Sequence, residues 1–87
     1  MHPYTKLFTG TTDWEPLSAV YLGFSGSLGA LPTNGSALEV RIGSDVTTQI
    51  TLIPGEFWPI DACDISSIQI KGNGLVLKAV GVTSLGW

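Results

Sequence analysis

The sequence predicts an all-β protein: a small antiparallel β-sandwich, of jelly-roll or immunoglobulin-like type, with Gly-rich loops and irregular terminal arms. Three observations support this. Residues 38–42 alternate apolar and polar side chains, as a half-buried strand does. Turn signals recur about every 8–12 residues, a spacing typical of sandwiches and small barrels. No window of helix length keeps an apolar stripe at helical spacing free of glycine and proline.

The N-terminal third contains two expected strands, residues 4–9 and residues 17–22, and the second is rich in β-branched and aromatic side chains. Residues 10–16 between them have no regular pattern, so residues 1–16 are expected to act as an N-terminal arm. Residues 23–36 hold four glycines and a proline. They are predicted to form the longest loop.

The middle of the chain contains the most regular strands, residues 37–42 and residues 48–53, in which apolar and polar side chains alternate. A type II turn is expected at Pro54-Gly55, because proline presets φ and glycine supplies a positive φ. Residues 56–60 form a short expected strand. Its proline, Pro59, cannot donate a ladder hydrogen bond, so the strand is expected to lie at the edge of a sheet or to end there.

The strongest local signal is the Gly-Asn-Gly sequence at residues 72–74, between two alternating runs. Asn-Gly between such runs predicts a tight hairpin, because both residues tolerate a positive φ. The hairpin is expected to span residues 68–82, with the isoleucines of its first strand facing the core. Residues 61–64 precede it as a connection, and residues 83–87 follow it as a C-terminal tail.

The 87 residues are expected to form one domain, residues 1–87. Charged residues make up 13% of the chain, against a usual share of about 25%, while the hydrophobic fraction is 44%. A small domain with so little charge is expected to bury surface against other chains. The four basic residues are scattered, so we expect no nucleic-acid or membrane partner.

No catalytic, cofactor or metal site is predicted, so the chain is expected not to be an enzyme. His2 is the only histidine and lies close to a terminus. Cys63 is the only cysteine, which excludes an internal disulfide, and nearby aspartates disfavour its thiolate. Asp61 and Asp64 alone are far from an oxygen cage for calcium. The absence of disulfides and of a signal-peptide pattern indicates synthesis in a reducing cytosol.

Aromatic side chains remain as candidates for binding a partner. We expect Tyr4, Phe8, Trp14 and Trp87 to contact neighbouring chains, because they lie in terminal segments expected to be irregular. The alternative for Trp87 is that the tail folds back on its own sandwich. A carbohydrate-binding module would instead expose its aromatic side chains in one row.

Four segments in a fixed order carry a resemblance to a known class: residues 40–48, 53–56, 64–72 and 80–82. Together they resemble small virion proteins of tailed bacteriophages, in which strands alternate with Gly-x-Asp-Val-Thr and Pro-Gly-Glu turns. The resemblance covers roughly residues 38–82. It implies a compact β-sandwich that decorates heads or occupies head, neck or tail positions, and it brings no catalytic residues.

The resemblance implies a non-enzymatic virion structural protein, in the first place a capsid cement or decoration protein that binds and stabilises the shell of major capsid protein. The expected partners are the major capsid protein or other virion proteins, together with further copies of the chain on the particle. The expected location is the virion, after synthesis in the host cytoplasm. A head–tail connector or tail structural protein and a small carbohydrate-binding module are the alternatives.

Overall fold

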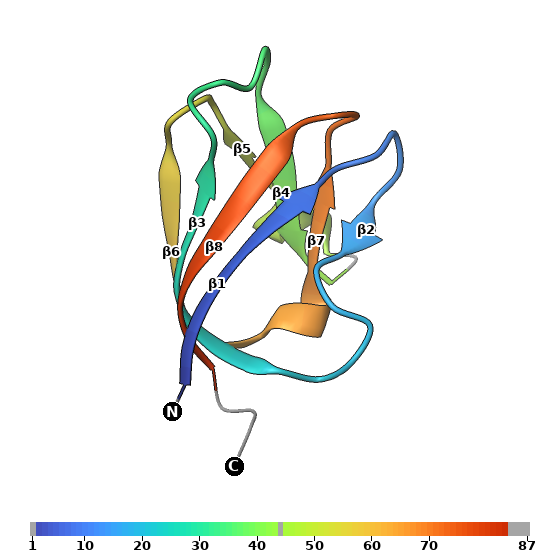
Figure 1. Ribbon diagram of the computed structural model, residues 1–87. Coiled ribbons are helices and arrows are strands. Elements are labelled where there is room, and N and C mark those ends of the chain that lie inside the picture. The colour runs from blue at the N-terminus through green and yellow to red at the C-terminus, as the bar shows by residue number, and fades with distance from the viewer. Residues whose placement is uncertain (1, 44, 84–87) are drawn as a thin grey trace.

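Eight strands and two single-turn 3-10 helices make up the computed structural model, which describes residues 2–43 and 45–83. The strands form two four-stranded antiparallel sheets (Figure 1). They are β1 (His2–Thr9), β2 (Glu15–Pro16), β3 (Gly23–Ala30), β4 (Leu38–Ile42), β5 (Ile50–Leu52), β6 (Phe57–Asp64), β7 (Ile68–Lys71) and β8 (Val76–Thr83). The short helices are η1 (Val46–Thr48) and η2 (Ile65–Ser67). The predicted all-β sandwich is therefore confirmed.

The order of the strands shows how the chain is wound. The first sheet has the order β1-β8-β3-β6, and the second has the order β2-β7-β4-β5. The pairs β1·β8, β2·β7, β3·β6 and β4·β5 are thus nested one inside another, as in a long hairpin that has been rolled up. Eight strands arranged in this way in two sheets form a jelly roll. Of the two predicted types of sandwich, this is the one observed.

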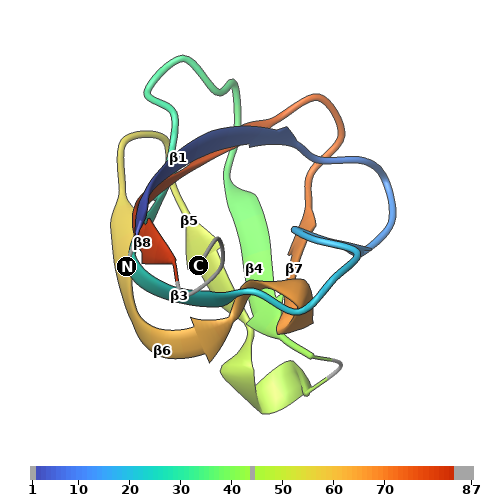
Figure 2. The same ribbon diagram turned by 60° about the horizontal axis from the view of Figure 1, so that its bottom comes forward.

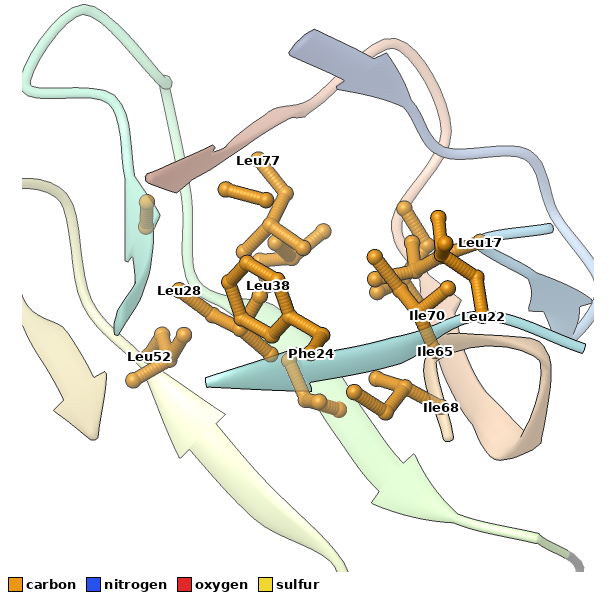
Figure 3. Close-up of a cluster of buried hydrophobic side chains, with 13 residues drawn as sticks. Leu17, Leu22, Phe24, Leu28, Leu38, Leu52, Ile65, Ile68, Ile70 and Leu77 are labelled. Carbon is orange, nitrogen blue, oxygen red and sulfur yellow. The ribbon is translucent and has the colours of Figure 1, made fainter. Parts of the chain in front are cut away.

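Aliphatic side chains around Phe24 fill the space between the two sheets (Figure 3). Phe24, Leu28 and Leu77 come from the first sheet and Leu38 from the second, and each is 1% exposed or less. Burying an apolar side chain of this size stabilises the fold by roughly 1.5–3 kcal/mol, so this layer holds the sheets together. The full buried set is Leu17, Leu22, Phe24, Leu28, Ala30, Leu38, Val40, Leu52, Ile65, Ile68, Ile70, Leu77 and Ala79. Figure 2 shows the strands of the two sheets arranged around a common centre.

The strands expected in the middle of the chain are present. β4 lies within residues 37–42 and β5 within residues 48–53, and Leu38 and Leu52 face the core as their alternation predicts. These two strands form a direct antiparallel pair. They are also the only described strands that are both consecutive and paired, because every other connection crosses from one sheet to the other.

The turn after β5 has the geometry expected of Pro54-Gly55. The Glu56 N–H donates to the Ile53 carbonyl at 2.9 Å, and Gly55 has a φ of +89°. β6 follows this turn and forms an edge of the first sheet. The edge position predicted from Pro59 is therefore confirmed, since no further described strand pairs on that side.

The glycine-rich segment 23–36 is not one long loop, as the sequence suggested. Its first part, Gly23–Ala30, is β3, an inner strand of the first sheet. The glycines serve close strand contact rather than loop geometry. A Cβ added at Gly26 would lie 2.1 Å from the Val80 carbonyl oxygen on β8, so only glycine fits there.

Residues 17–22, predicted as a strand, form an irregular crossover from the second sheet to the first. The crossover buries Leu17 and Leu22 near its two ends. The Leu17 N–H donates to the Ile68 carbonyl at 2.9 Å, and the Leu22 N–H donates to the Asp64 carboxylate at 3.1 Å. These partners replace a strand ladder, and β propensity is outweighed by the need to change sheets.

The predicted hairpin at residues 72–74 is wrong, although a turn is present there. β7 belongs to the second sheet and β8 to the first, so the strands on either side of the turn do not pair. The Leu75 N–H donates to the Gly72 carbonyl at 3.1 Å, and Gly74 has a φ of +76°. Asn73 is not among the residues with positive φ. Two alternating runs with a Gly-rich turn between them are compatible with a crossing between sheets as well as with a hairpin. For this reason the sequence pattern predicted the wrong strand pairing.

The N-terminal residues belong to the sandwich and do not form an irregular arm. His2–Thr9 pair along their whole length with β8, and Glu15–Pro16 pair with β7. The prediction that residues 1–16 form an arm separate from the sandwich is therefore wrong for β1 and β2. The predicted tail, residues 83–87, begins with a residue that is buried at the end of β8, Thr83. The rest of that tail lies outside the described residues.

Residues 61–64 are not a separate connection, because they continue β6. The register between β3 and β6 shifts between Phe24 and Gly26, where β6 carries one extra residue. This is a β-bulge, and Ala62 within it has a φ of +50°. The Ala62 N–H donates to the Ser25 hydroxyl oxygen at 2.9 Å, which gives the bulged backbone a partner.

Candidate functional site

The pairing register determines which side chains share each outer face, because residues directly opposite in an antiparallel pair point to the same side. In the first sheet, the buried residues Leu28 and Ala79 are partners, so the adjacent pair Ser27 and Val80 points outward. The same rule gives the whole outer surface, which we call the first-sheet face. It consists of Pro3, Thr5, Leu7, Thr9, Ser25, Ser27, Gly29, Phe57, Pro59, Val76, Lys78, Val80 and Val82, together with Asp61 of the bulge, which accepts from the Ser25 hydroxyl.

The first-sheet face is largely apolar, and Lys78 and Asp61 are the charged side chains in this set. Leu7 is 57% exposed, Phe57 73% and Val80 43%. The ring of Phe57 lies over Gly29, where an added Cβ would come within 2.7 Å of the ring. The other exposed large apolar side chains, Val20, Tyr21 and Ile53, lie outside this face.

The outer surface of the second sheet, the second-sheet face, is polar and charged. Arg41 and Gln69 are directly opposite, and the Arg41 Nε donates to the Gln69 Oε1 at 2.8 Å. The Arg41 guanidinium lies 4.1 Å from the centre of the Trp14 ring, a cation–π contact. Glu39 and Lys71 are also directly opposite. Such a face is stable in water without a partner.

Two hollows on the surface of the described residues are considered for ligand binding. The larger has a volume of about 530 Å³ and lies at one end of the second-sheet face. Its polar lining consists of Thr11, Thr12, Ser36, Glu39, Thr51, Lys71 and Asn73, and Ala37, Gly72 and Leu75 complete the lining. The smaller, of about 240 Å³, is lined by Tyr21, Gly23, Phe24, Ser25, Ala62, Val82 and Thr83.

The aromatic residues predicted to contact partners are distributed over different parts of the molecule. Tyr4 packs edge-on against Phe24 with 5.8 Å between ring centres, and burial raises the pKa of its hydroxyl. Phe8 is half-buried beside the core, with the Lys6 ammonium 5.2 Å from its ring centre. Trp14 lies on the second-sheet face. Contact of these residues with another chain stays a prediction.

Trp87, the fourth predicted partner residue, lies outside the described residues. The exposed apolar residues Leu7, Phe57 and Val80 were missed by the sequence analysis. Each lies in a strand and looks ordinary in the sequence. Only the register brings them onto one surface, so no local signal could have found them.

The aspartate and cysteine side chains that were weighed for metal binding or catalysis have structural partners. Asp64 caps η2: its Oδ1 accepts from the Ser66 N–H at 3.0 Å and its Oδ2 from the Ser66 hydroxyl at 2.7 Å. These bonds, with one from the Leu22 N–H, hold the pKa of the Asp64 carboxyl below its usual range. Asp61 accepts from the Ser25 hydroxyl at 3.3 Å. Cys63 is half-buried, with its Sγ 3.7 Å from the Asp64 carbonyl oxygen.

Within residues 2–43 and 45–83, no three or more histidine, cysteine, aspartate or glutamate side chains are grouped as a metal site requires. In the same part of the chain, no helix has the length and apolar character needed to cross a bilayer. Comparison of the chain with protein-family models, with curated proteins and with solved structures gave no match.

Proposed function

We propose that the chain is a non-enzymatic structural subunit of a tailed-phage virion, a cement or decoration protein that binds the shell of major capsid protein through the first-sheet face. The first-sheet face carries this proposal, because Leu7, Phe57 and Val80 are exposed there beside only two charged side chains, Lys78 and Asp61. The core of a protein–protein interface is depleted of charge in the same way. The opposite face holds opposed charges and suits the solvent side of a particle.

The shape of the first-sheet face also favours docking on a protein surface. The outward positions of β3 are serine and glycine, so a partner can approach the middle of the sheet closely. Apolar area removed from water contributes about 25 cal/mol per Å² before the costs of association. A modest affinity at each site is sufficient on a symmetric shell whose neighbouring sites are engaged together.

Two further observations support this class of function. The order of turn motifs in residues 38–82 resembles that of tailed-phage virion proteins. Jelly rolls also occur among viral capsid domains, but this fold hosts unrelated functions and adds weight only to the class. A head–tail connector or tail protein would use the same face at a lower copy number.

The first test is the protein content of virions purified from the organism that encodes the chain. Quantitative mass spectrometry should find tens to hundreds of copies per particle. A few copies per particle would move the proposal to the neck or tail. Absence from the particles would reject a virion role.

The second test locates the docking surface. Leu7→Asn and Val80→Asn should weaken binding to particles lacking the protein by at least about tenfold, because each places a polar group in an apolar interface. Thr51→Asn, an exposed position on the second sheet, is the matched control and should bind normally. Deletion of residues 84–87 and the substitution Trp14→Ala test whether particles are bound instead through the C-terminal tail or through Trp14. Normal binding by both asparagine variants together with loss in the latter two would contradict docking through the first-sheet face.

A further inference from the structure

The larger hollow, which we call the polar hollow, is built by two segments that are far apart in the sequence. The connection after β1 supplies Thr11, and the turn between β7 and β8 supplies Asn73. Figure 1 shows this connection and this turn side by side at one end of the molecule. The adjoining parts of β4 and β5 supply Glu39 and Thr51 as the floor. The proposed docking uses the opposite face, so the hollow would stay open on a particle.

The two walls are held together by backbone hydrogen bonds. The Gly72 N–H donates to the Thr11 carbonyl at 2.9 Å, and the Gly74 N–H donates to the Gly10 carbonyl at 3.1 Å. In return, the Gly10 N–H donates to the Leu75 carbonyl at 2.8 Å. A Cβ on Gly10 would lie only 2.4 Å from the Gly72 oxygen. The walls are therefore fixed before any ligand arrives, which lowers the entropic cost of binding.

The lining determines the class of ligand. Threonine hydroxyls at Thr11 and Thr51 and the amide of Asn73 can both donate and accept hydrogen bonds. The carboxylate of Glu39 and the ammonium of Lys71 come from directly opposite positions and offset each other in charge. A volume of about 530 Å³ falls within the usual range for ligand sites. These features match a neutral ligand with many hydroxyl groups.

We propose that the polar hollow binds a neutral oligosaccharide. An anionic ligand is disfavoured because Glu39 and Lys71 leave the lining without net positive charge, in a chain of net charge −3. An apolar ligand would leave the hydroxyl and amide groups without partners. No aromatic side chain lines the hollow, so recognition depends on hydrogen bonds, and we expect affinity in the millimolar range. This site is independent of the proposed docking on the first-sheet face.

The experiment uses the ¹⁵N-labelled full chain titrated with maltotetraose, cellotetraose and β-1,4-galactotetraose, and with tetragalacturonate as the acidic probe. At least one neutral tetrasaccharide should shift the amide signals of Thr11, Asn73 and Thr51 together, with saturation below about 20 mM. Absence of these shifts with every neutral probe would overturn the proposal. So would binding confined to tetragalacturonate or shifts confined to another surface.

Variants test the geometry of the site. Glu39→Gln should weaken binding roughly tenfold, because a hydrogen bond to a charged group becomes neutral. Thr51→Ala should also weaken binding, while Thr5→Ala, the same change on the first-sheet face, should not. Unchanged signal dispersion shows that each variant is folded, and equal binding by Glu39→Gln, Thr51→Ala and the parent would overturn the site. The two proposals can fail separately. A variant that loses sugar binding but still binds particles, or the reverse, shows that the two sites are independent.

Discussion

At the scale of single residues, two glycines determine how closely β3 and β8 can approach. Gly26 and Gly81 are directly opposite. A Cβ on Gly81 would lie 2.1 Å from the Ser25 oxygen and 2.7 Å from the Gly26 Cα. Tyr4 is the partner of Gly81 on the other side, and its ring packs against Phe24.

Gly81→Ala is expected to destabilise the protein by on the order of 3 kcal/mol, because the added methyl group meets backbone atoms that cannot move without separating the strands. Gly35→Ala is the matched control. It lies in a connection where an added Cβ meets nothing within 4 Å, and its free energy of unfolding should change by less than about 1 kcal/mol. Urea denaturation followed by tryptophan fluorescence measures both. Equal stability of the two variants would show that the close contact is unimportant.

At the scale of elements, alternation predicted β4, β5 and β7 well, because each buries one face. It could not say which strands pair. The turn at residues 72–74 looks like a hairpin until the Gly10 and Thr11 backbone occupies its hydrogen-bonding groups. That contact joins segments about 60 residues apart and leaves no local trace. The same reason explains why the polar hollow and the first-sheet face were not predicted.

The junction of β6 and η2 should make stability depend on pH. The Ser66 hydroxyl and N–H and the Leu22 N–H stabilise ionised Asp64, so its pKa is lower in the folded state than in the unfolded state. Its contribution is complete above the unfolded pKa of about 3.9 and is lost as the pH falls through the folded pKa. We expect the urea midpoint of the parent to fall between pH 6 and pH 3 by more than that of Asp64→Asn. The variant should already be less stable at pH 6.

Asp13→Asn is the matched control for this prediction, because Asp13 is exposed in the connection between β1 and β2. It should keep the pH dependence of the parent. Asp45 also has a lowered pKa, caused by the Thr47 hydroxyl and then the Thr47 N–H, and it contributes equally to all three proteins. A parallel pH dependence in Asp64→Asn and the parent would contradict the assigned role of Asp64.

At the scale of the whole molecule, the rolled hairpin makes most strand pairs distant in the sequence. Only β4·β5 is local, whereas β1·β8 joins His2 to Thr83 at the two ends of the described chain. Closing such long loops slows folding, because their entropy is lost before the contacts form. The jelly roll is one of the two sandwich types expected from the sequence, but every strand pattern is equally compatible with a simple meander. The jelly-roll order of the strands therefore leads to a prediction about the folding rate, which could not have been made from the composition.

A circular permutant should fold faster than the parent while keeping the same fold. Joining residue 87 to residue 1 turns β8 and β1 into consecutive strands, with a connection of hairpin-loop length, about 2–5 residues. Opening the chain at Gly35, in the exposed connection between β3 and β4, breaks no strand. In the new order, the pairs β1·β8, β3·β8 and β2·β7 become closer in sequence, β4·β5 and β4·β7 are unchanged, and only β3·β6 becomes more distant.

Stopped-flow refolding monitored by tryptophan fluorescence should show the main phase accelerated by about threefold or more in the permutant. Slow phases from proline isomerisation should be common to both proteins and are set aside. The matched control is a permutant opened between Pro54 and Gly55, which separates the consecutive but unpaired strands β5 and β6 along the chain without breaking a strand and still joins β8 to β1. If joining β8 to β1 determines the rate, both permutants refold faster than the parent. Refolding of both at the parental rate would show that closure of the outermost pair, β1·β8, does not limit folding of this jelly roll.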